Sequence, residues 1–92
     1  MKVNFYATMR MAVGGKTVDV PLREGDSVRK LVEVMIEKFP QLRPMLLNDE
    51  GGLSPRVNVF VNGRGAPYLR EQYDTPLVAT DQVDVFPALA GG

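Results

Sequence analysis

One stretch of the chain, residues 28–39, places its apolar residues at the spacing of an α-helix. These residues recur every three or four positions and form a single stripe: Val28, Leu31, Val32, Met35, Ile36 and Phe39. Charged residues fill the other side, which is typical of a helix that packs on a core with one face. Asp26 and Ser27 are residue types that cap helix N-termini, and Pro40 ends the segment because the residue before a proline disfavours the helical conformation. We therefore expect one main helix over residues 28–39.

Four shorter segments alternate between apolar and polar residues, with the period of a half-buried β-strand. Three of them are residues 2–6, 16–22 and 57–61, and Val83 and Val85 define the fourth, which Pro87 ends. A loop with the pair Gly14-Gly15 separates the first two segments, so we expect them to pair as an antiparallel hairpin. Asn62-Gly63 directly follows the third segment and is a strong signal of a tight turn.

The elements follow one another in the order β-β-α-β-β. This order predicts an α+β domain of two layers, in which one main helix packs on one face of a mixed sheet. The first and last strands should lie side by side at the centre of that sheet. Residues 1–87 are expected to form the domain, and residues 88–92 a flexible C-terminal tail.

The composition removes several classes of chemistry. The 92 residues include eleven basic and eleven acidic ones without a basic block, which gives little support to nucleic-acid binding. Neither cysteine nor histidine is present, so disulfides, a Ser-His-Asp triad and the usual zinc sites are excluded. No apolar run is long enough to span a bilayer, and Met1 leads into a strand pattern with no signal peptide. We expect a cytoplasmic protein that binds no metal, cofactor or membrane.

Two further motifs have a plain interpretation. Gly63-Arg64-Gly65 lacks the Lys-Ser/Thr pair and the helix that a phosphate-binding loop requires. Asp81 and Asp84 lie near the last strand, and we expect a solvated pair there rather than a metal site or an acid/base pair.

The chain ends in the feature with the clearest chemical meaning, Ala90-Gly91-Gly92. Glycine has no Cβ and enters extended and positive-φ conformations that other residues avoid. A tail of this kind can thread a narrow channel and present its carboxylate in the active site of another protein. The carboxylate of Gly92 is therefore expected to carry the chemistry, while Gly91 and Ala90 let the tail thread. The alternative is a frayed terminus or a truncated chain, because terminal residues are usually disordered.

Strand parity separates valines from aromatic residues. The valines of the last two strands share one face: Val57, Val59, Val61, Val83 and Val85. If that face packs on the helix, Phe60 and Phe86 lie on the open side of the sheet, close to the tail. Together with Leu89 they form a candidate surface for a partner protein. The alternative is that residues 41–55 or 64–76 fold over the sheet and bury one or both rings.

The element order and the tail together resemble the β-grasp, ubiquitin-like sulfur carriers, which include the small subunit of molybdopterin synthase and the thiamine-pathway sulfur carrier. The resemblance covers the whole chain. Its landmarks are Val3–Tyr6, Asp26-Ser27-Val28, Val59-Phe60-Val61-Asn62-Gly63, Asp74-Thr75-Pro76-Leu77, Asp81-Gln82-Val83 and Pro87-Ala88-Leu89-Ala90-Gly91-Gly92. The single proline before the tail and the ending Ala-Leu-Ala-Gly-Gly look more like the carriers that deliver sulfur for cysteine synthesis.

The resemblance implies a carrier that is not itself an enzyme. A partner adenylating enzyme of the E1 type would use ATP to activate the carboxylate of Gly92, and sulfur would then replace the adenylate to leave a thiocarboxylate. A sulfur-accepting synthase, for cysteine, molybdopterin or another product, would take up the sulfur. A protease that trims the C-terminus is a further candidate partner.

Three alternatives stay open. The chain is equally compatible with a ubiquitin-like modifier joined through Gly92 to lysines of target proteins. It also fits the small subunit of molybdopterin synthase, with its tail inserted permanently in a catalytic partner. The last alternative is a β-grasp interaction module whose Gly-Gly ending is incidental.

Overall fold

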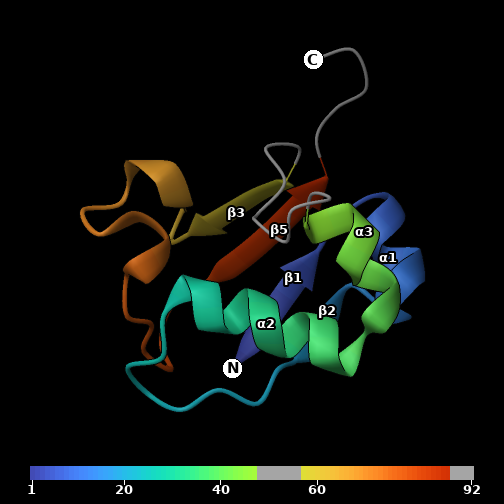
Figure 1. The fold of residues 1–92 in the computed structure, drawn as a ribbon, viewed down its shortest axis with the longest axis horizontal. Helices are drawn as coiled ribbons and strands as arrows, with labels where there is room; N and C mark the ends of the chain where they lie inside the picture. Colours follow the sequence, from blue (N-terminus) through green and yellow to red (C-terminus); the bar gives the residue numbers. More distant parts are fainter. Residues whose placement is uncertain (48–56, 88–92) are drawn as a thin grey trace.

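A five-stranded mixed sheet with the strand order β2-β1-β5-β3-β4 forms one layer of the fold (Figure 1). The computed structural model describes residues 1–47 and 57–87 of the chain. The strands are β1 (Lys2–Phe5), β2 (Thr17–Asp19), β3 (Val57–Val61), β4 (Arg64–Gly65) and β5 (Val83–Pro87). The helices are α1 (Thr8–Val13), α2 (Val28–Lys38) and α3 (Arg43–Leu46), and the 3₁₀ turns are η1 (Pro40–Leu42), η2 (Ala66–Tyr68) and η3 (Gln72–Asp74).

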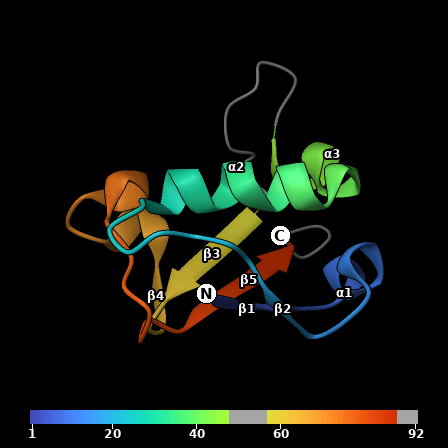
Figure 2. The ribbon, with the colours of Figure 1, turned by 90° about the horizontal axis from the view of Figure 1, so that it is seen from below.

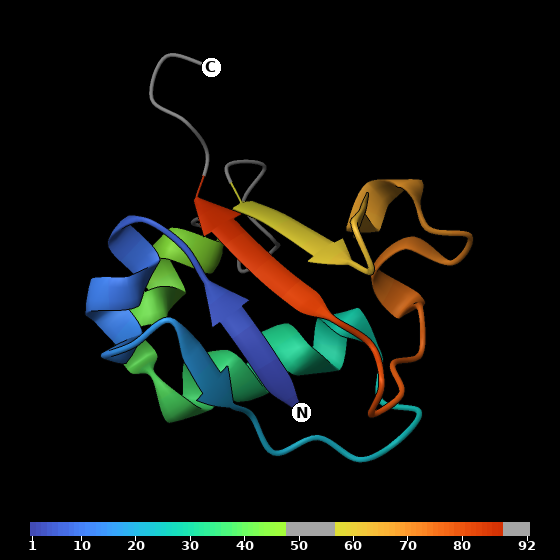
Figure 3. The same ribbon diagram turned by 180° about the vertical axis from the view of Figure 1, so that it is seen from behind.

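The two central strands come from opposite ends of the sequence. β1 and β5 run parallel, with Val3 opposite Val83 and Phe5 opposite Val85 (Figure 3). β2 pairs with β1 and β3 pairs with β5, both antiparallel. The predicted first hairpin and the predicted central position of the first and last strands are therefore confirmed.

α2 and α3 cover one face of the sheet, and the core lies between these two layers (Figure 2). Four members of the predicted helical stripe are buried there, namely Val28, Leu31, Val32 and Met35. Ile36 and Phe39 are only partly buried, and α2 ends one residue earlier than predicted, so that Phe39 is its C-cap. Ser27 caps the start of α2, since its Oγ accepts a hydrogen bond of 3.1 Å from the backbone N–H of Lys30.

No helix within residues 1–47 and 57–87 is long and apolar enough to cross a membrane.

The connection between β1 and β2 contains a short helix, α1, that the sequence pattern did not reveal. Gly14 ends this helix in the left-handed conformation, with a φ of 79°. Its N–H donates to the carbonyl of Arg10 at 2.9 Å. The pair Gly14-Gly15 is thus a turn, as predicted, but one that closes a helix rather than a simple hairpin loop. β2 covers only three of the seven positions predicted as strand.

Asn62 and Gly63 make the tight turn that the sequence predicts. Both have positive φ angles, 52° and 83°, as the common two-residue hairpin turn requires. The turn pairs Val61 with Arg64 and creates the short edge strand β4, a fifth strand that the sequence pattern did not predict.

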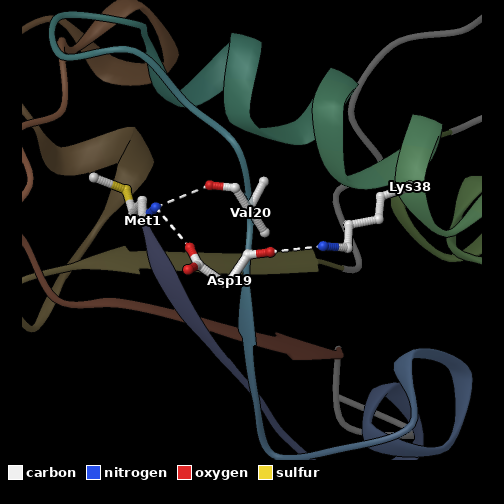
Figure 4. Close-up of polar contacts among 4 residues, drawn as sticks. All are labelled: Met1, Asp19, Val20 and Lys38. Atoms are coloured by element: carbon white, nitrogen blue, oxygen red, sulfur yellow. Dashed lines mark hydrogen bonds and ion pairs between the residues drawn. The ribbon is translucent and has the colours of Figure 1, made fainter.

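The first residue of the chain is fixed to strand β2 (Figure 4). The amino group of Met1 donates to Oδ1 of Asp19 at 3.0 Å and to the carbonyl of Val20 at 2.9 Å. From the end of α2, Lys38 Nζ donates to the carbonyl of Asp19 at 2.9 Å. The hydrogen bond from the ammonium group lowers the pKa of the Asp19 carboxyl below its ordinary value, with attraction between the two charges as the second cause.

Candidate functional site

β5 brings the end of the described chain to the centre of the sheet, where Pro87 pairs with Val57. The four predicted site residues of the tail, Leu89, Ala90, Gly91 and Gly92, lie outside the described residues, and their roles stay predictions. Phe60 and Phe86, the other two, lie within the described part. The candidate site can therefore be examined where β5 ends.

Phe60 and Phe86 lie together with Tyr6 in one cluster on the face of the sheet opposite α2, which we call the open face. The rings of Tyr6 and Phe86 are stacked, with centroids 4.2 Å apart and planes 12° apart. The ring of Phe60 meets Phe86 edge-on at 5.4 Å and 83°. We call these three residues the aromatic cluster. The edge-on pair lies within the centroid range of about 4.5–7 Å that aromatic pairs prefer, and the stacked pair is slightly closer, so all three rings are in direct contact.

The strand register explains how these rings meet. Phe5 pairs with Val85 across the parallel strands, so the next residues, Tyr6 and Phe86, stand beside each other on the opposite face. The valines on the core side are buried, as predicted: Val59, Val61, Val83 and Val85. Phe60 and Phe86 are half-buried. The predicted division of the faces is confirmed, and the described residues do not fully cover either ring.

Asp84 corrects one prediction from the sequence. We expected Asp81 and Asp84 to be a solvated pair, yet the Asp84 residue is only 7% exposed. Its Oδ1 accepts hydrogen bonds from Asn4 Nδ2 at 2.9 Å and from the Tyr6 hydroxyl at 3.0 Å. Its Oδ2 accepts one from Gln82 Nε2 at 3.1 Å. The expectation failed because parity alone placed Asp84 on the open face without showing how many neighbours would cover it there.

Asp81 has a structural role in the loop before β5. Its carboxylate accepts hydrogen bonds from Asn62 Nδ2 at 2.9 Å and from the backbone N–H of Val78 at 2.8 Å. Within the described ranges, no group of three or more acidic side chains is placed to hold a metal ion. The two aspartates therefore do not form one site.

Two positively charged residues, Arg10 and Lys16, lie beside the aromatic cluster on the side of α1. The Arg10 guanidinium carbon lies 5.3 Å from the centre of the Tyr6 ring, and its Nε donates to the carbonyl of Phe5 at 2.9 Å. A hollow of about 50 Å³ beside Tyr6 is lined by both Arg10 and Lys16. The hydrogen bond to Asp84 raises the pKa of the Tyr6 phenol above its ordinary value, and desolvation adds to the effect. The surface is thus apolar at its centre and positively charged at this edge.

Sequence reasoning missed Tyr6 and Asp84 as parts of the site, although a signal for Tyr6 was present. Tyr6 alternates with Phe5 at the end of the first strand, and the predicted pairing of the first and last strands places it near Phe86. The described part of the site offers an aromatic surface held in place by ring contacts and a hydrogen bond. It is suited to binding.

The model of the ThiS family matches residues 3–92, nearly the whole chain. The chain belongs to the ThiS family. This family comprises small ubiquitin-like β-grasp proteins that act as sulfur carriers and modifiers. A curated relative, small archaeal modifier protein 3 of Haloferax volcanii, is 33% identical over 92 residues, which cover 100% of this chain and 98% of the relative.

Solved structures of ThiS-family relatives confirm the predicted β-grasp fold. The crystal structure of SAMP1 from Haloferax volcanii has a TM-score of 0.85 and 25% identity, and the match covers 100% of this chain and 98% of that one. A chain in the crystal structure of the BexX/CysO complex of Amycolatopsis orientalis has a TM-score of 0.77 and 23% identity, with 99% and 98% covered. The second likeness concerns the fold alone.

Proposed function

We propose that this chain is a sulfur carrier whose Gly92 carboxylate is activated by a partner enzyme and converted to a thiocarboxylate. The observation that carries the proposal is the course of β5, which ends at Pro87 beside a half-exposed aromatic cluster, directly before the Gly-Gly tail. A partner that binds the cluster would have the tail within its reach. The family match, which extends to residue 92, supports the same assignment.

The chemistry follows from the weakness of a carboxylate as an acyl donor. An oxygen of the Gly92 carboxylate attacks the α-phosphorus of ATP bound to the partner and displaces pyrophosphate, which leaves an acyl-adenylate. Hydrosulfide from a sulfur donor then displaces AMP, so that a C–S bond replaces the C–O bond and the product is a terminal thiocarboxylate. The chain contains no histidine or cysteine, so acid/base and sulfur-transfer groups come from the partners. Gly91 and Ala90 allow the tail to enter the partner's active site.

The partners follow from this sequence of steps. An E1-like adenylating enzyme binds ATP, and a synthase accepts the sulfur. The ending Ala-Leu-Ala-Gly-Gly resembles that of carriers for cysteine synthesis, and we propose that pathway. Molybdopterin synthesis, in which the chain would be the small subunit of the synthase, is the less favoured alternative. A protease would act before activation on any chain extended beyond Gly92. We place these steps in the cytoplasm, where ATP is available.

The aromatic cluster is the docking surface that we propose for the activating enzyme. Phe86 and Phe60 offer apolar area on the strands beside the point where the tail begins, and we propose that Leu89 of the tail joins the contact with the partner. Arg10 and Lys16, at the edge of the cluster, suit an acidic side chain on the partner.

A second candidate function is protein modification, which the relationship to small archaeal modifier protein 3 favours. Its first step is the same adenylation of Gly92. The acyl group then passes to a lysine amine of a target protein instead of to sulfur, and an amide bond forms.

Intact-mass spectrometry tests the proposal and separates the two candidates. The chain is incubated with ATP, the host's adenylating enzyme and a sulfur donor, beside a variant that lacks Gly92 and a second variant, Gly91→Val. We expect a species in which one terminal oxygen is replaced by sulfur in the wild-type chain alone. A wild-type mass that stays unchanged would contradict the carrier function. Conjugates to lysine in host extract, without any thiocarboxylate, would favour the modifier.

A further inference from the structure

Asp84 is the only buried charged residue among the described residues, at 7% exposure, and it lies on the open face. Burying a carboxylate costs free energy unless hydrogen bonds compensate for the lost water. Three neutral donors do so here, from Asn4, Tyr6 and Gln82. No lysine or arginine of the described ranges forms an ion pair with it. A buried carboxylate of this kind fixes the geometry of its donors more than it stabilises the fold.

The donor that matters most for the candidate site is Tyr6. Its hydroxyl is bound to Asp84 at 3.0 Å, while its ring is stacked on Phe86. Phe86 in turn meets the edge of Phe60, and Phe60 stands directly opposite Asp84 across the β3–β5 pair. Asp84, Tyr6, Phe86 and Phe60 thus form one connected ring of residues on the open face, in which each residue contacts the next or is paired with it across two strands.

Tyr6 needs such an anchor because it lies just beyond the end of β1. Its backbone N–H still donates to the carbonyl of Val85, at 3.2 Å. The next residue, Ala7, has a φ of 53°, a value that residues with a side chain rarely adopt, and the chain then turns into α1. The hydroxyl bond to Asp84 therefore holds the far end of a side chain whose backbone is leaving the sheet.

We propose that Asp84 is a positioning residue for the docking of the activating enzyme. It acts through Tyr6, which it holds flat against Phe86, so that Phe86 is presented in one orientation beside the tail. Asp84 itself is buried and is therefore not presented to the partner. This inference rests on the proposed function, since the docking that it improves is the step before adenylation of Gly92.

The expected effect is on binding rather than on chemistry. A surface that is already ordered before association loses less conformational freedom on binding. If the Tyr6–Phe86 stack is no longer held by Asp84, the KM of the adenylating enzyme for the carrier should rise about two- to ten-fold. The kcat of that enzyme should stay unchanged. A residue that served only the fold would lower the melting temperature without changing KM.

The test uses Tyr6→Phe, Asp84→Ala and the double variant as substrates of the host's adenylating enzyme, with Tyr73→Phe as the matched control. Tyr73, in η3, is partly buried against the core and is not a member of the aromatic cluster. We expect a raised KM in both single variants and no further rise in the double variant, because both changes break the same bond. Asp84→Asn keeps an oxygen for Tyr6 and should restore most of the wild-type KM. In the free protein, NMR contacts between rings 6 and 86 should weaken in Tyr6→Phe.

The outcomes separate this inference from the proposed function. Wild-type KM values in Tyr6→Phe and Asp84→Ala, or unchanged ring contacts in Tyr6→Phe, would overturn the role of Asp84 alone. Additive effects in the double variant would also overturn it, because they would show that Tyr6 acts independently of Asp84. If the wild-type chain is not adenylated at all, the proposed function fails, and this inference fails with it. If Asp84→Ala does not fold, the KM and the ring contacts of Tyr6→Phe alone decide whether Asp84 has this role.

Discussion

The rings of Tyr6 and Phe86 are stacked at 4.2 Å, although the two residues come from opposite ends of the described chain. The contact depends on the parallel pairing of β1 with β5, which places both residues on the open face. Both rings are half-buried, and with Phe60 they form a contiguous aromatic patch rather than scattered surface residues. The pair is therefore the basis of the docking surface that we propose on the open face.

The first prediction concerns Phe86. Phe86→Ala should weaken binding to the adenylating enzyme about ten-fold or more, because aromatic residues at the centre of an interface contribute most to affinity. The fold should persist, since Phe86 is half-buried on the open face and is not part of the buried core. Titration calorimetry measures the affinity and circular dichroism the fold. Phe39→Ala is the control, because Phe39 is a half-buried phenylalanine at the end of α2, in the other layer, and this variant should bind like the wild type. An unfolded Phe86→Ala protein would show that Phe86 belongs to the core.

A second prediction concerns the turn between β3 and β4. Gly63 has a φ of 83°, so Gly63→Ala should lower the free energy of unfolding by about 1–2 kcal/mol. Gly15→Ala is the matched control, because a Cβ would meet nothing within 4 Å at either position and Gly15 lacks the left-handed φ. Urea denaturation measures both. Equal stability of the two variants would contradict the assigned turn.

A third prediction concerns the start of α2. Ser27→Ala removes the oxygen that accepts from the N–H of Lys30, and should cost about 1 kcal/mol of unfolding free energy. Ser27→Asp keeps an acceptor at the cap and should retain most of the stability. The same denaturation experiment applies. A loss as large in Ser27→Asp as in Ser27→Ala would point to a cause other than capping.

A fourth prediction concerns pH. The amino group of Met1 lowers the pKa of Asp19, so the folded state binds this proton less readily than the unfolded chain. The contribution to stability should be complete above the ordinary value of 3.8 and disappear as the pH falls through the lower, folded-state pKa. Asp19→Asn should therefore be less stable than the wild type at neutral pH, with the difference closing in acid. A difference independent of pH would contradict the ion pair, and acetylation of the amino group serves as an independent check.

Elements with a long or regular apolar period could be predicted from the sequence. The stripe from Val28 to Met35 and the alternation around Val59 and Val85 identify their elements and buried faces directly. α1 escaped because it has six residues and begins after Ala7, which supplies neither a capping side chain nor a usual φ. Gly14 was the one signal that could have revealed it, as a helix C-cap. β4 escaped because two residues show no period.

The candidate site was predictable only where strand parity sufficed. Parity placed Phe60 and Phe86 on the open face, and the structure confirms that placement. The contact between Tyr6 and Asp84 could not be predicted, because it depends on the register of β1 against β5 and on the turn of the chain at Ala7. Side-chain hydrogen bonds between distant strands leave no periodic trace in a sequence.

The central position of β5 also determines when the chain can fold during its synthesis. β5 pairs on one side with β1 and on the other with β3, so it is the strand that joins the two hairpins into one sheet. Until residues 83–87 leave the ribosome, β1 and β3 each have an unpaired edge, which is the kind of edge that associates with other chains. We expect nascent chains of this protein to stay unfolded until β5 has been synthesised, and fragments that stop before β5 to be aggregation-prone rather than to form a smaller folded domain.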